Sequence, residues 1–406
     1  MDIKQLLPTT TIEPEVFRFD KCELDRMVSA LWDAGYTVIG PQVRDSAIVY
    51  DEISGLDDLP QGVHDSQQPG KYRIVDAGHD NYFEFNVGPH SWKQFLFPPQ
   101  LSLASGSRDE GGWTFKTAQH PQTKYALLGA RACELAAIAV QDRVFLQGPY
   151  VDPAYKARRE AALIIAVNCT VAAATCFCQS TQTGPRCQQG FDLALTELAD
   201  GFLAEIGSQR GRELLGKINT REANAQDRHE AGEMQQRAAD QLSKQLDTRD
   251  LRNLLLDNLD HPHWDDVGQR CLSCTNCTMV CPTCFCSSVS EVSSLEGDQV
   301  ERVRHWDSCF NIDFSHTANG VVRNDRRSRF RQWLTHKLAS WHDQFESSGC
   351  VGCGRCITWC PVGIDLTEEV AKLRGEPNTN RKLPIAGPAK TVCVVPEKVP
   401  QSKILE

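Results

Sequence analysis

Two runs of cysteines share the spacing C-x2-C-x2-C-x3-C-P, which is typical of [4Fe–4S] cluster ligands. Thiolates three residues apart in a tight loop can each reach a different iron of one cubane. The members are Cys271, Cys274, Cys277 and Cys281, followed by Pro282, in the first run, and Cys350, Cys353, Cys356 and Cys360, followed by Pro361, in the second. Two complete copies with the closing proline predict two [4Fe–4S] clusters.

The fourth cysteine of each run points away from its own loop and ligates the other cluster in two-cluster proteins. The predicted ligands are Cys271, Cys274, Cys277 and Cys360 for cluster 1, and Cys350, Cys353, Cys356 and Cys281 for cluster 2. Gly352 and Gly354 lie between ligands, where a missing side chain lets backbone N–H groups approach the sulfides. Structural zinc and disulfides are the alternatives, but zinc sites usually show paired C-x2-C knuckles.

Eighteen cysteines are present, so ten remain outside the two runs. Residues 125–130 and 162–167 are apolar runs that predict buried strands, and Cys133 and Cys169 follow them closely. Ligands of parallel sheets lie beyond the carboxyl ends of the strands. Together with Cys176 and Cys178 in the same loop as Cys169, these cysteines predict a third iron–sulfur cluster. The alternative is that Cys133 and Cys169 are small core residues.

A further group of three thiols follows the first run. Cys284, Cys286 and Cys309 form a candidate additional site, whose fourth ligand would be Asp307, His305 or a cysteine of the sheet domain. The segment Thr283-Cys-Phe-Cys repeats the Thr175-Cys-Phe-Cys of the predicted third site. We assign no role to the remaining cysteines, which are Cys22, Cys187 and Cys393.

Apolar runs that alternate with helical patterns predict an α/β N-terminal domain with a parallel or mixed sheet. A ferredoxin-like domain of the bacterial two-[4Fe–4S] type, with a long helical insertion between its halves, would follow. The expected regions are 1–219 (α/β domain), 220–265 (helical linker), 266–374 (dicluster domain) and 375–406 (extended tail). Local patterns predict strands over 37–39, 72–75, 82–87, 113–115 and 201–206, and helices over 24–34, 190–198 and 210–217. The basic stretch 323–342 predicts a solvated helix face, a surface for an acidic partner, or compensation of cluster charge.

Composition and the motifs that are missing narrow the functions this chain can have. A formal net charge of −10 argues against nucleic acid as a partner. No apolar run is long enough to span a membrane, and the first residues lack a signal-peptide core, so we expect a cytoplasmic protein. Clustered cysteines there indicate metal rather than disulfides. We find no G-x-G-x-x-G that opens a helix and no P-loop, so the chain shows electron carriers without a hydride site of its own. This pattern predicts a non-catalytic electron-transfer subunit of an oxidoreductase complex.

Several segments resemble one protein family. They are Leu128-Gly-Ala-Arg-Ala-Cys-Glu, Asn168-Cys through Thr175-Cys-Phe-Cys, Gly190-Phe-Asp-Leu-Ala-Leu-Thr-Glu-Leu, Cys271 through Cys286, Trp306-Asp-Ser-Cys, and Cys350 through Pro361. Over residues 125–365 the chain resembles the iron–sulfur beta subunit of cytosolic, sulfhydrogenase-type [NiFe] hydrogenases. It is also similar to the related iron–sulfur subunit of anaerobic sulfite reductase.

The resemblance implies a set of partners. A flavin- and NAD(P)-binding gamma subunit would exchange electrons with this chain, and a small iron–sulfur delta subunit and a [NiFe] catalytic alpha subunit would lie beyond it. The alternatives are the equivalent electron-transfer subunit of an anaerobic sulfite or sulfur reductase, a scaffold whose metals only hold the fold, and a catalytic role for the predicted third site, such as sulfur reduction.

Overall fold

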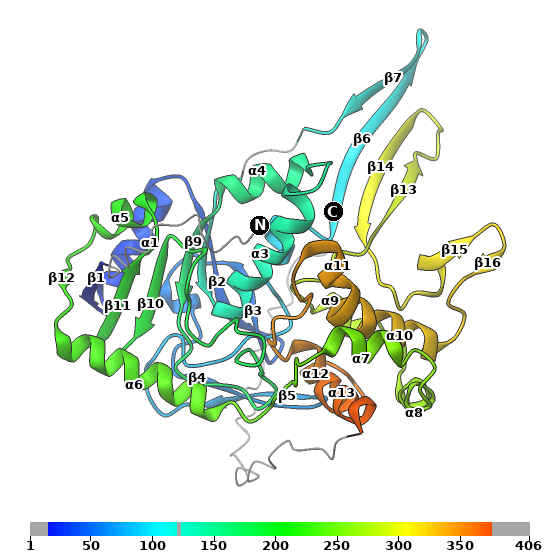
Figure 1. The fold of residues 1–406 in the computed structure, drawn as a ribbon. Helices are drawn as coiled ribbons and strands as arrows, with labels where there is room; N and C mark the ends of the chain where they lie inside the picture. The colour runs from blue at the N-terminus through cyan, green and yellow to red at the C-terminus, as the bar shows by residue number, and fades with distance from the viewer. Residues whose placement is uncertain (1–14, 120–122, 376–406) are drawn as a thin grey trace, which may run out of the picture.

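The computed structural model describes residues 15–119 and 123–375 (Figure 1). An eight-stranded mixed sheet forms the body of the N-terminal half, in the order β12-β1-β11-β10-β9-β8-β2-β3. Its centre is parallel: β9 pairs with β8 and β10, and β8 pairs with β2. The flanking strands are antiparallel. The prediction of a parallel or mixed sheet is therefore confirmed.

The bounds of the elements are as follows. The strands are β1 (Val16–Asp20), β2 (Thr37–Arg44), β3 (Ala47–Glu52), β4 (Val63–Gln68), β5 (Lys71–Asp76), β6 (Gln100–Asp109), β7 (Gly112–Thr117), β8 (Tyr125–Ala130), β9 (Leu163–Val167), β10 (Leu193–Glu197), β11 (Gly201–Ile206), β12 (Arg221–Glu222), β13 (Ser287–Ser293), β14 (Gln299–Trp306), β15 (His316–Thr317) and β16 (Gly320–Val321). The α-helices are α1 (Glu23–Asp33), α2 (Lys93–Leu96), α3 (Ala132–Leu146), α4 (Pro153–Ala161), α5 (Gln209–Leu215), α6 (Ala225–Gln241), α7 (Leu251–Asp257), α8 (His263–Arg270), α9 (Asn276–Met279), α10 (Arg326–Thr335), α11 (Trp341–Phe345), α12 (Arg355–Thr358) and α13 (Leu366–Arg374). Short 3-10 segments occur at η2 (Leu56–Asp58) and η3 (Ile312–Ser315), and η4 (His336–Ser340) is π-helical.

Two local predictions in the sheet domain are wrong. The predicted helix over 190–198 is instead strand β10, which is buried along its whole length between β9 and β11. A short apolar run does not distinguish a buried strand from a helix, and hydrogen bonding to the neighbouring strands determines that this run forms a strand.

Residues 82–87 do not form a strand, because side chains bind their backbone. Glu197 accepts hydrogen bonds from the N–H groups of Tyr82 and Phe83, and Arg131 donates to the carbonyls of Phe83 and Phe85.

A second sheet joins the two halves of the chain. Its order is β13-β14-β6-β7, so a hairpin from residues 287–306 pairs with a hairpin from residues 100–117 and projects from the body (Figure 1). The predicted long helical insertion between the cysteine runs is not confirmed. Residues 287–321 hold two hairpins and a 3-10 turn, and helices occupy only the last third of the insertion. The predicted domain limits remain predictions.

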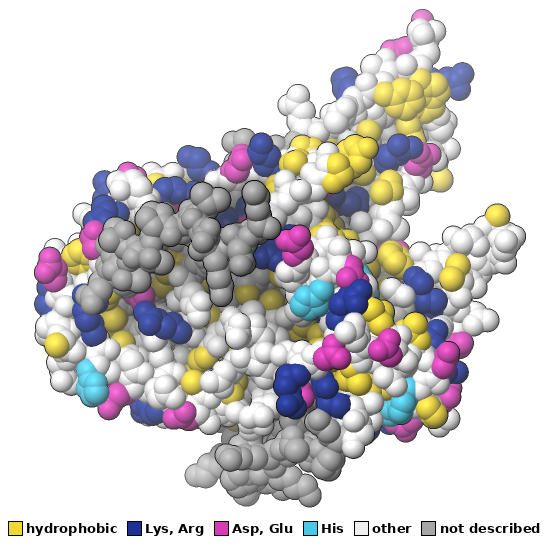
Figure 2. All heavy atoms as spheres, viewed as in Figure 1, with side chains coloured by type: hydrophobic (Ala, Val, Ile, Leu, Met, Phe, Trp, Pro, Cys, Tyr) yellow, Lys and Arg dark blue, Asp and Glu magenta, His cyan; other side chains and the backbone are white. Residues whose placement is uncertain are grey.

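The surface in Figure 2 mixes acidic and basic side chains over the body and gathers apolar ones on the projecting sheet. Trp113 and Phe115 lie on that sheet, are exposed, and stack with ring centroids 5.8 Å apart. Within residues 15–119 and 123–375, no helix has the length and apolar character needed to cross a membrane.

Candidate iron–sulfur centres

The structure brings the four predicted ligands of cluster 1 together. Cys271, Cys274 and Cys277 lie around α9, where Ser273 and Thr275 adopt positive φ and turn the chain tightly. Cys360 comes from the second loop and lies near Cys277. Burial raises the pKa of Cys277, and the neighbouring thiolates of Cys271, Cys360 and Cys274 raise it further. Backbone N–H groups point at the sulfurs, with Ser273 N 3.4 Å from Cys271 Sγ and Ile364 N 3.3 Å from Cys360 Sγ.

The predicted ligands of cluster 2 also converge. Burial raises the pKa of Cys350 to about 12, and Cys353 and Cys281 add to the shift. The pKa of Cys356 is raised by burial and then by Cys350, Cys353 and Cys281. Cys281 therefore reaches the second loop while Cys360 reaches the first, as the crossed ligation of two-cluster domains requires.

The spacing of these sulfurs does not match mononuclear zinc. Zn–S bonds of 2.3 Å in a tetrahedron place sulfurs about 3.8 Å apart. Among the described residues, the one group of three or more candidate ligands whose atoms all lie within 4.8 Å of one another is His263, Asp266 and Glu369, which contains no cysteine. The wider separation of the thiols fits a multi-iron cluster better than a single ion.

The four cysteines of the predicted third site line one cavity. Its walls include Cys133 at the start of α3, Cys169 just after β9, and Cys176 and Cys178 in the loop that follows. Strands β8 and β9 are parallel neighbours, so both cysteine-bearing loops leave the same edge of the sheet. The pKa of Cys133 and of Cys176 is raised well above its usual range, chiefly by burial. Metal binding to such thiols would release their protons.

The third cavity adjoins cluster 2. Cys353, a predicted ligand of cluster 2, lines the same cavity. Phe177 N donates to Gly352 O (2.8 Å), and Thr183 Oγ1 donates to Val351 O (2.7 Å). A Cβ on Gly352 would lie 2.6 Å from Cys178 Cα, and one on Gly354 would lie 2.5 Å from Thr175 O. These two glycines therefore allow the loops of the two sites to touch.

A buried ion pair fastens the second cysteine loop to the sheet domain. The Arg355 guanidinium lies 2.5 Å from Glu134, and both side chains are almost fully buried. Glu134 also accepts hydrogen bonds from Tyr50 Oη (2.9 Å) and Trp92 Nε1 (3.1 Å), and Arg355 donates to the carbonyls of Gly88 and His90. Sequence reasoning did not assign this role to Glu134 or Arg355, because their partners lie far away in the chain.

The three surplus thiols adjoin cluster 2 on another side. Cys284 neighbours Cys281, and the neighbouring thiol of Cys309 lowers the pKa of Cys286 to about 7. Cys187 is buried but does not line the third cavity, Cys22 is exposed, and Cys393 lies outside the described residues.

Two buried lysines face these thiols. Lys337 Nζ lies 3.2 Å from Cys281 Sγ, 3.1 Å from Thr283 Oγ1 and 3.0 Å from Gly349 O. Lys93 Nζ lies 3.2 Å from Cys284 O and 3.8 Å from the centroid of Trp306. Lys337 belongs to the basic stretch 323–342, for which a solvated face, an acidic-partner surface and compensation of cluster charge were the three expectations. It is 3% exposed and lies against Cys281, so at this residue the solvated face is wrong and the contact fits compensation of cluster charge. Sequence reasoning missed Lys93, whose neighbours Trp92 and Phe95–Phe97 are the only hint of burial.

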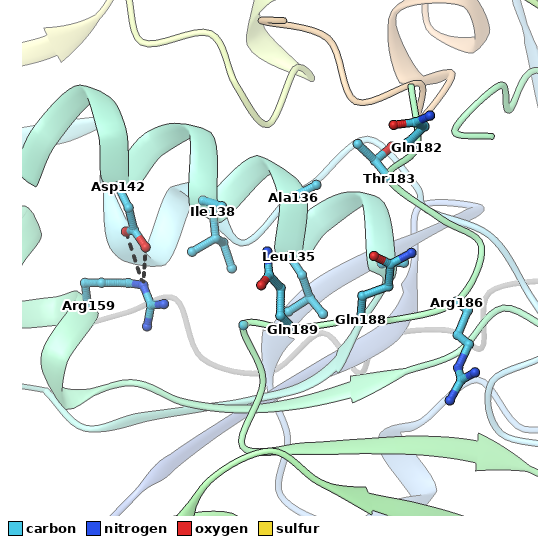
Figure 3. A pocket seen from close by; sticks show the side chains of 13 residues that line it. Leu135, Ala136, Ile138, Asp142, Arg159, Gln182, Thr183, Arg186, Gln188 and Gln189 are labelled. Carbon is cyan, nitrogen blue, oxygen red and sulfur yellow. Dashed lines mark hydrogen bonds and ion pairs between the residues drawn. The ribbon is translucent and has the colours of Figure 1, made fainter. Parts of the chain in front are cut away.

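A separate pocket lies on another side of α3. Figure 3 shows it between Leu135, Ile138 and Asp142 of the helix and the loop through Gln188 and Gln189. Arg159 pairs with Asp142 across it at 3.1 Å. Its lining residues include no cysteine, so it is distinct from the cluster sites.

The donor set fits iron–sulfur clusters. Thiols gathered from two loops, backbone N–H groups aimed at sulfur and buried ammonium groups match the anionic charge of thiolate-ligated clusters. Residues 270–364 match the family model described as a 4Fe-4S dicluster domain. The chain is 32% identical over 340 residues to "Sulfhydrogenase 2 subunit beta" of Pyrococcus furiosus, covering 83% of this chain and 92% of that protein. The chain belongs to the sulfhydrogenase beta subunit family. The predicted resemblance is thereby confirmed. No solved structure matches this chain significantly.

Proposed function

We propose that this chain is an electron-transfer subunit that relays single electrons between a flavin- and NAD(P)-binding gamma subunit and a [NiFe] hydrogenase module. Iron–sulfur clusters, when bound, supply one-electron redox chemistry. The residues of this chain hold them, set their surroundings and keep them next to one another. Membership of the sulfhydrogenase beta family supports hydrogenase partners, here the small iron–sulfur delta subunit and the catalytic alpha subunit.

One observation carries the proposal: three cysteine sets adjoin in a row. Cys353 belongs to the cluster 2 set and also lines the third cavity, while Cys281 and Cys360 cross between the loops of clusters 1 and 2. At the far end, Cys274 is exposed. The order third site, cluster 2, cluster 1 gives a path from the edge of the sheet to the surface, where a partner can receive or supply electrons.

The first test is to interrupt this path in the assembled complex. Cys274→Ala or Cys353→Ala should abolish NAD(P)-linked turnover and leave hydrogen activation with artificial dyes, because the dyes reach the catalytic subunit directly. Cys22→Ala, at an exposed cysteine outside the path, should retain both activities. Equal loss of NAD(P)-linked and dye-linked activity in the two path variants would contradict the relay.

The second test concerns the third site. Cys178→Ala should lower iron and acid-labile sulfide by about four per chain, since a [4Fe–4S] cluster holds four of each. The electron paramagnetic resonance (EPR) signals of the other clusters should persist. Unchanged iron would show that Cys133, Cys169, Cys176 and Cys178 are core residues.

A further inference from the structure

Two polar side chains other than cysteine line the third cavity. They are Asn86 and Arg131, and the other lining residues apart from the cysteines are alanine, valine, leucine or proline. Both polar side chains are buried, with exposures of 4% and 1%. A buried polar group is costly unless it is hydrogen-bonded, so each of their donors needs an acceptor.

Each of the two side chains has a donor without an acceptor in the protein. The Asn86 Nδ2 atom and the Arg131 Nε atom are both buried, and neither finds a hydrogen-bond acceptor among residues 15–119 and 123–375. The lining residues that remain are apolar or cysteine. The cysteines, or a group that they bind, are therefore the acceptors that this cavity offers to the two donors.

Arg131 also brings a positive charge to the cavity. Its Nη2 atom donates to the carbonyls of Phe83 (2.7 Å) and Phe85 (2.9 Å), and its Nη1 atom donates to the carbonyl of Asn168 (3.4 Å). These acceptors are neutral and do not cancel the guanidinium charge. A buried cation without a counter-charge is strongly destabilising.

The carboxylates in this region have other partners. Glu134 pairs with Arg355, and Glu197 accepts from the backbone N–H groups of Tyr82 and Phe83. The guanidinium of Arg131 therefore suits an anion in the cavity that it lines.

The same contacts of Arg131 place Asn86. Since Arg131 holds the carbonyls of Phe83 and Phe85, it fixes the segment that carries Asn86 to the cavity wall. The backbone N–H of Asn86 is fixed in turn by a hydrogen bond to the Asp65 carboxylate. The irregular course of residues 82–87 thus presents an amide to the cavity.

We propose that Arg131 Nε–H and Asn86 Nδ2–H donate hydrogen bonds to sulfur atoms of the third cluster, and that the Arg131 guanidinium is its buried counter-charge. This inference rests on the proposed third cluster at Cys133, Cys169, Cys176 and Cys178. A cluster held by four thiolates is anionic, and N–H···S bonds and positive charge stabilise its more negative, reduced state. Without these two side chains the apolar walls would keep the midpoint potential of the cluster lower.

The amide is tested by an EPR redox titration of the full-length chain prepared without oxygen. Asn86→Leu removes a donor that has no acceptor in the protein, so the variant should keep its iron, and the midpoint potential of the third cluster should fall. The signal of that cluster is the one missing from Cys178→Ala. Thr335→Val is the control, because it removes a buried hydroxyl without a partner in α10, outside the cavity. It should leave the midpoint unchanged.

The charge is tested with two substitutions of Arg131. Arg131→Met should lower the same midpoint more than Asn86→Leu does, and Arg131→Lys, which keeps the cation, should lower it less than Arg131→Met. If Arg131→Met does not fold, Asn86→Leu still decides. A wild-type midpoint of the third cluster in Asn86→Leu or in Arg131→Met overturns the role of that residue and leaves the relay intact. If Cys178→Ala retains all of its iron, the third cluster itself fails.

Discussion

The Nζ atom of Lys337 lies 3.2 Å from the Sγ atom of Cys281, a predicted cluster ligand, inside the protein. Burial alone would lower the pKa of Lys337, but the neighbouring thiolates of Cys281, Cys284, Cys350 and Cys356 raise it well above its usual range. The ammonium group sits on the π-helical segment η4, and such single-turn π segments are frequent at functional sites.

This contact predicts a lowered potential in Lys337→Met. A charge-assisted hydrogen bond to a ligand sulfur stabilises the reduced state more than the oxidised one. If the difference is about 1.4 kcal/mol, the one-electron midpoint of cluster 2 falls by roughly 59 mV. EPR redox titration measures this shift, and Lys337→Arg should retain most of the wild-type potential. A midpoint that is the same in the Met variant as in the wild type would show that the contact has no electrostatic effect on the cluster.

Gly352→Ala should separate the second cysteine loop from the third site. Gly352 has φ +62°, and its new Cβ would lie 2.6 Å from Cys178 Cα, so backbone must move. We expect loss of the third cluster's iron and retention of cluster 1. Gly232→Ala is the matched control, because Gly232 lies within α6 and its Cβ would meet no atom within 4 Å. Retention of all iron in Gly352→Ala would contradict the close packing of the two loops.

Glu134→Gln should destabilise the junction between the sheet domain and the second cysteine loop. The substitution leaves the buried Arg355 guanidinium without its carboxylate, and breaking a buried pair typically costs about 3–5 kcal/mol. The visible absorbance of the clusters during heating should be lost at a lower temperature than in the wild type. The control is Glu160→Gln, which removes one partner of the exposed pair with Lys156. Exposed pairs of this kind contribute about 0–1 kcal/mol. If Glu134→Gln and Glu160→Gln lose their cluster absorbance at the same temperature, the buried pair adds no stability.

The parts of the centre that sequence predicted are those set by short-range spacing. Cys271, Cys274 and Cys277 lie within one loop, so their common cluster follows from the pattern alone. Cys133 and Cys169 were predicted to meet because the strands before them read as consecutive and parallel. In the structure β8 and β9 are such strands, and both cysteines line one cavity.

Long-range contacts explain what sequence could not predict. The burial of Lys93 depends on its approach to Cys284, 191 residues later. The pairing of β6 with β14 joins residues 100–107 to 299–305, and no local pattern specifies such a register. Residues 82–87 have the composition of a strand, but Glu197 and Arg131 occupy their backbone hydrogen-bonding groups. In each case the deciding partner comes from a distant part of the chain.

Metal analysis combined with EPR on the chain prepared without oxygen tests the central claim most directly. We expect a coloured protein with at least about twelve irons and equal sulfide, and fast-relaxing EPR signals after reduction that show interaction between neighbouring [4Fe–4S] clusters. A colourless protein that binds zinc and no iron would contradict it.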